Sequence, residues 1–460
     1  MSTFNASLDQ PLTTRKQLLD PFIEGNKTAD TWKIGTEHEK FVFNTHDLSA
    51  ALYDGAQGIS ALLQSLTRFG WSYINENGKV IGLHRAGANI TLEPAGQLEL
   101  SGAPLSTVHD TRDELLQHFD ELYHVAPALG LDFFSMGFQP KYSRSQLPWV
   151  PKQRYQIMRR YMPTVGSLGL DMMSRTCTVQ VNLDYADEAD MVQKFRIAMA
   201  LQPLATALFA DSPFTEGKPN GYLSYRAFIW QHTDSHRTGQ LDFVFDEGFG
   251  FERYVDYLLN VPMYFVYRNG KYYDVAGASF ADWMAGRLSC LPGEVATRAD
   301  WQQHMTTAFP DVRLKSYLEM RGADSGTMDR LCALPAFWVG LLYDTHARDA
   351  AWDLVKAMTK EQRHALHHSV PKHALDVPYA KGTVRDLARE VLAIARSGLS
   401  RRAQCDALGQ DETQYLDVLD QIVDSGITPA KHKLDLFYSK WSQNVDPIFS
   451  IFSYAQTHRL

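Results

Sequence analysis

Thr176–Tyr185 alternates along its whole length between polar and apolar side chains. The polar positions are Thr176, Thr178, Gln180, Asn182 and Asp184, and the apolar positions are Cys177, Val179, Val181, Leu183 and Tyr185. Because successive residues of a strand point to opposite faces, this strand has one core face and one polar face. That pattern is typical of an antiparallel sheet, since strands of a parallel sheet are buried on both faces. We therefore predict an α+β protein built on an antiparallel sheet.

Three other segments fit the same sheet: Thr31–Phe43, Asn89–Ser101 with an interruption at Pro94–Gly96, and Val312–Arg321, which we predict as one strand. In the first, Glu37 and Glu39 are two residues apart and share a face. Together these segments present acids and bases on polar faces: Glu37, Glu39, Glu93, Glu99, Glu319, Arg313, Lys315 and Arg321.

The chain divides into three parts by pattern. Residues 1–30 form a leader with a short helix near Thr14–Ile23, residues 31–330 form the sheet body, and residues 331–460 form a helical C-terminal part of the same unit. Asn77–Gly78 and Asn269–Gly270 each predict a tight hairpin. Glu188–Ala210 predicts a long helix that kinks or breaks at Pro203.

Composition excludes several classes of protein. The net charge of −8 argues against a nucleic-acid or anionic-membrane partner. The longest apolar run, Leu334–Tyr343, is too short to span a bilayer, and the N-terminus has no apolar signal segment. The four cysteines are far apart in the sequence, which predicts reduced thiols and a cytoplasmic location.

The polar faces have two interpretations. A half-exposed sheet can simply turn its polar face to water. Alternatively, the glutamates converge with arginines on a site for Mg²⁺ and phosphate, because oxygen-rich carboxylate sites suit Mg²⁺ and Mg²⁺ commonly arrives with substrate phosphates. The pattern alone leaves both interpretations open.

Other chemistries lack their motifs. The chain has no G-x-x-x-x-G-K-[ST] loop and no G-x-S-x-G elbow. His38-Glu39 begins like the zinc-protease motif, but Val42 stands where the second histidine is required. Cys177 lies on the apolar face of its strand, which favours packing over nucleophilic catalysis.

Several long blocks resemble the glutamate–cysteine ligases of the plant and proteobacterial type: IGTEHEKF (34–41), RTCTVQVNLDY (175–185), FGFERYVDYLLNVPMYF (249–265), RLKSYLEMRGAD (313–324) and ALPAFWVGLLYD (333–344). The resemblance runs from about residue 30 to the end. It implies a glutamine synthetase-like fold, a curved antiparallel sheet with outer helices. It also implies that ATP activates the γ-carboxylate of L-glutamate for attack by the amine of L-cysteine, the first step of glutathione synthesis.

The resemblance also implies roles for residues. Five glutamates would hold two or three Mg²⁺ ions at the ATP phosphates: Glu37, Glu39, Glu93, Glu99 and Glu319. The catalytic cations would be Arg313, Lys315 and Arg321, with Lys315 also contacting the nucleotide. Gln180 would act beside the metals, and Tyr264 would line the nucleotide pocket. Arg226 and Arg154 would bind amino-acid carboxylates, since arginine grips a carboxylate with two hydrogen bonds.

The sequence departs from the plant pattern. Cys290 and Cys332 each resemble one half of a plant regulatory disulfide, but no partner cysteine stands where one is needed, and no plastid leader is recognisable. We therefore expect a cytoplasmic enzyme of bacterial type without that redox switch. A ligase for another amine, a binding or regulatory pseudoenzyme and a metal-dependent hydrolase are the alternatives. Feedback inhibition by glutathione and the choice between monomer and homodimer stay open.

Overall fold

The alternating segments lie in one sheet. The computed structural model describes residues 10–457, so residues 1–9 of the predicted leader lie outside it. The sheet is nine-stranded and antiparallel throughout, which confirms the predicted class. Its strands run in the order β14 (Val312–Leu314), β15 (Leu318–Asp324), β7 (Thr178–Leu183), β1 (Ile34–Asn44), β5 (Leu98–Ser101), β4 (Ala88–Leu92), β3 (Lys79–Arg85) and β2 (Ser72–Glu76), with β6 (Leu131–Phe134) paired to β1.

Helices cover the apolar face of this sheet. They are α3 (Val108–Val125), α6 (Glu188–Leu208) and α11 (Met328–Leu342), with α2 (Ile59–Leu66) over β3. Nearly every residue of α11 is buried, because the helix lies between β7 on one side and α14 (Val384–Arg402) on the other. A helix that is apolar all round is stable only in such an interior position.

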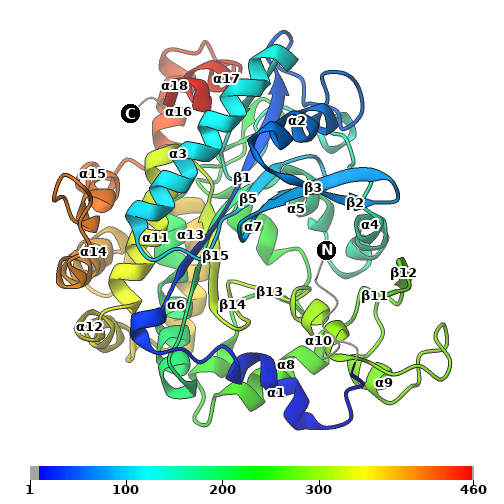
Figure 1. Cartoon of the computed structure of the whole chain (residues 1–460). Coiled ribbons are helices and arrows are strands. Elements are labelled where there is room, and N and C mark those ends of the chain that lie inside the picture. The colour runs from blue at the N-terminus through cyan, green and yellow to red at the C-terminus, as the bar shows by residue number, and fades with distance from the viewer. Residues whose placement is uncertain (1–9, 458–460) are drawn as a thin grey trace.

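The C-terminal part is helical, as the pattern predicts. Outside α11 and α14 lie α12 (Thr345–Val355), α13 (Lys360–His373), α15 (Asp417–Ser425), α16 (Pro429–Ser439), α17 (Pro447–Ile451) and α18 (Tyr454–Thr457). Of these, α12 and α15 pack on α6 and α11, α13 packs on α6 and α7 (Tyr225–Gln231), and α18 packs on β6 (Figure 1). No helix within residues 10–457 is both long and apolar enough to cross a membrane.

A layer of shorter elements lies over the polar face. It comprises α4 (Gln153–Val165), α5 (Gly169–Arg175), α7, the hairpin of β11 (Phe265–Arg268) and β12 (Lys271–Asp274), and α10 (Arg298–Met305). Beside it, β10 (Thr238–Gly239) pairs with β13 (Phe309–Pro310), and α1 (Arg15–Ile23) packs on α8 (Phe251–Asn260) and α10. The polar face is therefore enclosed, and most of it does not face water. This excludes the first interpretation, in which the polar face is simply turned to solvent.

Both tight hairpins are confirmed. β2–β3 turns at Asn77–Gly78 and β11–β12 turns at Asn269–Gly270, and all four turn residues have positive φ. A two-residue turn with positive φ at both positions matches the twist of the flanking strands.

Two sequence predictions need correction. Val312–Arg321 is not one strand: the chain reverses at Lys315–Tyr317, so Arg313 in β14 lies opposite Glu319 in β15. That reversal has no glycine, proline or asparagine to mark it. In addition, the predicted break at Pro203 does not occur, because α6 continues through that residue, while a kink there stays a prediction. The helix lies between the sheet and the C-terminal helices, where packing on all sides outweighs one lost hydrogen bond.

Candidate active site

Four of the predicted glutamates line one cavity of about 220 Å³. Glu37 and Glu39 come from β1, Glu99 from β5, and Glu93 from the residue after β4. β1 and β5 are paired so that Glu39 lies directly opposite Glu99. The alternation of β1 turns these carboxylates to the cavity, while Ile34, Thr36, His38 and Lys40 point to the helix side.

These carboxyl groups repel one another in a buried site. Burial raises the pKa of Glu37, Glu39 and Glu99, and the neighbouring carboxylates raise all three further. Local hydrogen bonds oppose the shift: the Thr178 amide donates to Glu39 at 2.9 Å, and Asn182 donates to Glu37 at 2.9 Å. The arrangement therefore carries surplus negative charge that a bound cation would neutralise.

Cations gather at the other side of the sheet face around Glu319. Arg313 Nε lies 2.6 Å and Arg321 Nη1 2.8 Å from Glu319 Oε2, and Lys315 Nζ lies 3.4 Å from Oε1. Burial alone would raise the pKa of Glu319, but these three cations hold it well below its usual range. Arg313 and Arg321 line the cavity; Glu319 and Lys315 are not among its lining residues.

Two more predicted side chains complete the cavity from the covering layer. Arg226 on α7 is buried, and its Nη2 donates to the Arg321 carbonyl at 2.9 Å. Arg154 on α4 donates to the Tyr155 hydroxyl at 3.1 Å. The Nε atoms of both arginines have no partner within the described residues. Each guanidinium can therefore bind a further acceptor after a small adjustment.

Gln180 and Tyr264 have different surroundings. Gln180 lines the cavity, and its Oε1 accepts a 2.6 Å hydrogen bond from Arg321, so it orients that guanidinium. Tyr264 is only 1% exposed and does not line the cavity. The Arg237 guanidinium lies 3.9 Å from its ring centre. The structure thus brings together nine of the predicted residues and leaves Tyr264, Glu319 and Lys315 outside the cavity wall.

The sequence analysis missed the apolar wall. It includes Trp230, Met158, Met172, Met173, Phe265 and Phe309. Helical spacing could have predicted part of this wall. Trp230 follows Arg226 by four residues on α7, and Met158 follows Arg154 by four residues on α4. An arginine and an apolar side chain at that spacing share one face of a helix.

The donor set can hold Mg²⁺ in one particular way. Among residues 10–457, no group of three or more His, Cys, Asp or Glu side chains is gathered closely enough to hold a metal ion by itself. Mg²⁺ is commonly bound by one or two carboxylates, with water and substrate phosphates supplying the other ligands. Four carboxylates spread around one cavity and facing guanidinium groups fit that shared mode rather than an all-protein cage.

The four cysteines are free thiols. Cys177 and Cys332 are buried, and burial raises the pKa of both. Cys290 and Cys405 are exposed. Neither buried thiol lines the cavity, so neither is a candidate nucleophile there.

Comparison with known proteins gives a consistent answer. Residues 33–450 match the model of glutamate–cysteine ligase family 2. The chain is 53% identical over 441 residues to the chloroplastic glutamate–cysteine ligase of Brassica juncea, covering 96% of this chain and 84% of that one. It is 52% identical over 441 residues to the chloroplastic enzyme of Arabidopsis thaliana, covering 96% and 83%.

A solved structure shares the fold at low sequence identity. It is the glutamate–cysteine ligase of Francisella tularensis in complex with AMP, with a TM-score of 0.57 and 13% identity, covering 93% of this chain and 88% of that one. One expectation is contradicted: a cytoplasmic location was predicted, but the curated relatives are chloroplastic enzymes. The cysteine spacing and the composition of the first residues do not decide the compartment.

Proposed function

The chain belongs to glutamate–cysteine ligase family 2, and we propose that it joins the γ-carboxylate of L-glutamate to the amine of L-cysteine at the expense of ATP, the first step of glutathione synthesis. One observation carries this proposal: a set of buried and half-buried carboxylates with surplus negative charge faces a set of guanidinium groups across one cavity. A phosphoryl transfer to a carboxylate needs both, because the phosphates require cations and the amino acids require fixed positive partners.

Glu37, Glu39, Glu93 and Glu99 would hold Mg²⁺ with the ATP phosphates, and the ions would supply charge neutralisation there. The raised pKa values of Glu37, Glu39 and Glu99 support this role, since a cation relieves the repulsion. The expected number of ions, two or three, belongs to the proposal. Glu319 would contribute indirectly, by orienting Arg313, Lys315 and Arg321.

Arg313 and Arg321 would stabilise the transferring phosphoryl group. An oxygen of the glutamate γ-carboxylate attacks the γ-phosphorus, the bond to ADP breaks, and ADP leaves with the electron pair. Gln180 and Glu319 accept hydrogen bonds from Arg321, so its guanidinium is already in position before the reaction begins. Such preorganisation lowers the barrier without any reorientation during the step.

The second step forms the amide. The cysteine nitrogen attacks the acyl carbon of γ-glutamyl phosphate, the carbon–oxygen bond to phosphate breaks, and the nitrogen loses a proton. Phosphate is a much better leaving group than the oxide of a free carboxylate. Arg226 and Arg154 would hold amino-acid carboxylates, because both are at the cavity with an unpartnered Nε.

The test is ATP-dependent phosphate release with L-glutamate and Mg²⁺, measured with cysteine, with other small amino acids and without an amine. Release that rises most with cysteine, together with γ-glutamylcysteine as product, is the expected result. Release that favours a different amine would keep the mechanism and assign the chain to another ligase reaction. No release with any amine would overturn the proposal.

A further inference from the structure

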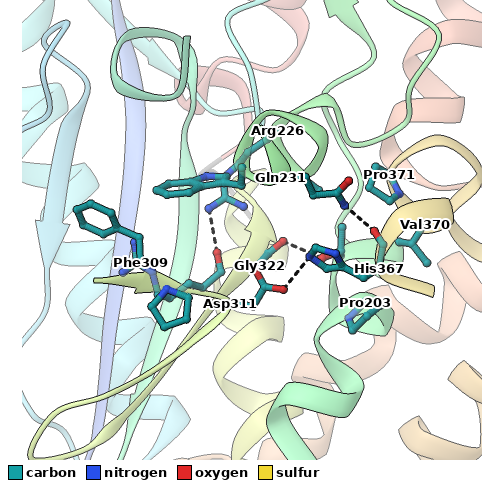
Figure 2. Close-up of a pocket in the computed structure, with 14 residues that line it drawn as sticks. Pro203, Arg226, Gln231, Phe309, Asp311, Gly322, His367, Val370 and Pro371 are labelled. Carbon is teal, nitrogen blue, oxygen red and sulfur yellow. Dashed lines mark hydrogen bonds and ion pairs between the residues drawn. The ribbon is translucent and has the colours of Figure 1, made fainter. Parts of the chain in front are cut away.

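A second, smaller cavity of about 30 Å³ lies behind the wall of the candidate active site (Figure 2). Four residues line both cavities: Arg226, Trp230, Phe309 and Arg321. On the far side the small cavity is closed by Asp311, next to β14, and by His367 on α13. Groups that line this second cavity therefore approach the guanidiniums of Arg226 and Arg321 from the side away from the candidate active site.

Asp311 is anchored at three points. Its amide donates to the Gly239 carbonyl at 2.9 Å, and its own carbonyl accepts from the Arg321 amide at 3.0 Å. Its carboxylate lies 3.1 Å from Nε2 of His367. Figure 2 shows the imidazole facing this carboxylate, while the His367 carbonyl accepts from Gln231 at 2.6 Å. His367 is thus held at both its backbone and its ring.

Arg226 needs a free guanidinium if it is to bind a substrate carboxylate. Within residues 10–457 it forms no ion pair, and its Nε has no hydrogen-bond partner. Burial lowers the pKa of Arg226, and the carboxylates of Asp324, Glu39 and Asp311 act against that shift. Asp311 and Arg226 line the same small cavity, yet the Asp311 carboxylate lies against the His367 ring, 3.1 Å from Nε2, and forms no ion pair with Arg226.

We propose that His367 is a positioning residue of the ligase reaction: by pairing with Asp311, it keeps that carboxylate away from Arg226, so the guanidinium stays available for the substrate. This inference rests on the proposed function, in which Arg226 holds an amino-acid carboxylate, and it assigns that carboxylate to glutamate. A carboxylate released next to a buried guanidinium would form an ion pair with it. Glutamate would then have to displace that ion pair before it could bind.

The test compares the steady-state kinetics of His367→Ala, Asp311→Asn, the double variant and His367→Lys. His367→Ala should raise KM for glutamate about tenfold, while KM for ATP and kcat stay within about twofold. The double variant should return KM for glutamate to near the wild-type value, because the competing charge is gone. His367→Lys should also restore it, since an ammonium can pair with Asp311. His368→Ala, on an exposed neighbouring position, is the matched control.

Two results would overturn the inference. One is a double variant no better than His367→Ala, which would mean that His367 does not act through Asp311. The other is an equal rise of all Michaelis constants, which would indicate a general structural role; unfolding midpoints of the variants identify that case. Arg226→Ala separates this inference from the proposed function. If it leaves KM for glutamate unchanged, the proposed role of Arg226 fails as well; if it raises KM while His367→Ala does not, only the inference fails.

Discussion

Glu39 and Glu99 lie directly opposite each other on β1 and β5, with both carboxyl groups turned into the same enclosed cavity. Like charges directly opposite each other on paired strands destabilise a sheet. Burial strengthens the conflict, because it raises the pKa of both groups. The opposed carboxylates therefore lower the stability of this strand pair at the place where the proposed function requires a cation.

Glu99→Gln should separate stability from activity. The change removes one of the opposed charges. Thr91 and Ser101 donate to different oxygens of Glu99, so the amide oxygen can keep one of these hydrogen bonds and the amide NH2 can donate to the other hydroxyl. We expect the metal-free protein to keep its free energy of unfolding or gain about 1 kcal/mol, and turnover to fall at least about 100-fold. Urea unfolding and phosphate release measure the two effects. Glu247→Gln, at an exposed position, should change neither. A destabilised variant with normal turnover would contradict the assignment.

The same carboxyl groups predict how stability depends on pH. Their folded-state pKa values lie above the ordinary value of 4.5, so the folded chain binds more protons than the unfolded chain. This contribution to stability is present below the unfolded pKa and is lost as pH rises through the folded pKa. With EDTA present, the free energy of unfolding should fall as pH rises above 4.5, the ordinary pKa of these groups.

The comparison with Glu99→Gln isolates this effect from other groups. Asp324, for example, contributes with the same sign, because burial raises its pKa to about 6. The slope against pH should be smaller in Glu99→Gln than in the wild type, and saturating Mg²⁺ should flatten the wild-type slope. Equal slopes in the two proteins would show that Glu99 is not part of the repelling set.

Much of this site could be predicted because alternation in a strand determines the face of every side chain. Spacing alone places Glu37 and Glu39 on the polar face of one strand and Gln180 on the polar face of another. The structure turns all three to the cavity. Spacing cannot show which strands are neighbours. The opposition of Glu39 and Glu99 depends on the register between β1 and β5, which is set by how the apolar faces of the two strands pack in the fold.

The hairpin of β14 and β15 shows a different limit. Its turn residues, Lys315–Tyr317, include Ser316 but no glycine, proline, asparagine or aspartate. Leu314 and Leu318 reach the core whether the segment is one strand or two. The hydrophobic pattern therefore fits both arrangements. Tyr264 shows a third limit, since an aromatic side chain in a pocket wall and one in the core look alike in a sequence.

Glu319→Gln should behave in the opposite way to Glu99→Gln. From the sequence, Glu319 is expected to be one of five Mg²⁺ ligands, but in the structure it compensates three buried or half-buried cations. Removing it leaves those charges uncompensated, and we expect a loss of about 3 kcal/mol or more in the free energy of unfolding. Urea unfolding at neutral pH measures this. A variant as stable as the wild type would show that the cations find other partners.

Arg154→Ala tests the covering layer of the cavity. Arg154 lines the cavity, whereas Arg160, on the same helix α4, has a side chain that is 61% exposed and pairs with Asp274. We expect Arg154→Ala to raise KM for one of the two amino acids at least about tenfold, because a bidentate carboxylate contact is lost, and Arg160→Ala to change KM less than twofold. Michaelis constants for glutamate, cysteine and ATP decide the outcome. A rise confined to ATP would reassign Arg154 to the nucleotide.

Gly398→Ala tests how the helical C-terminal part is joined to the sheet body. A Cβ atom at Gly398 on α14 would lie 1.9 Å from the backbone oxygen of Gly340 on α11, so the two helices would have to move apart. Because α11 also packs on β7, the displacement would reach the sheet. We expect a loss of about 2 kcal/mol in the free energy of unfolding, measured by urea unfolding. Ser400→Ala, at an exposed position of the same helix, should change it by less than about 0.5 kcal/mol. If Gly398→Ala matched that control, the contact between α11 and α14 would have to be looser than the structure indicates.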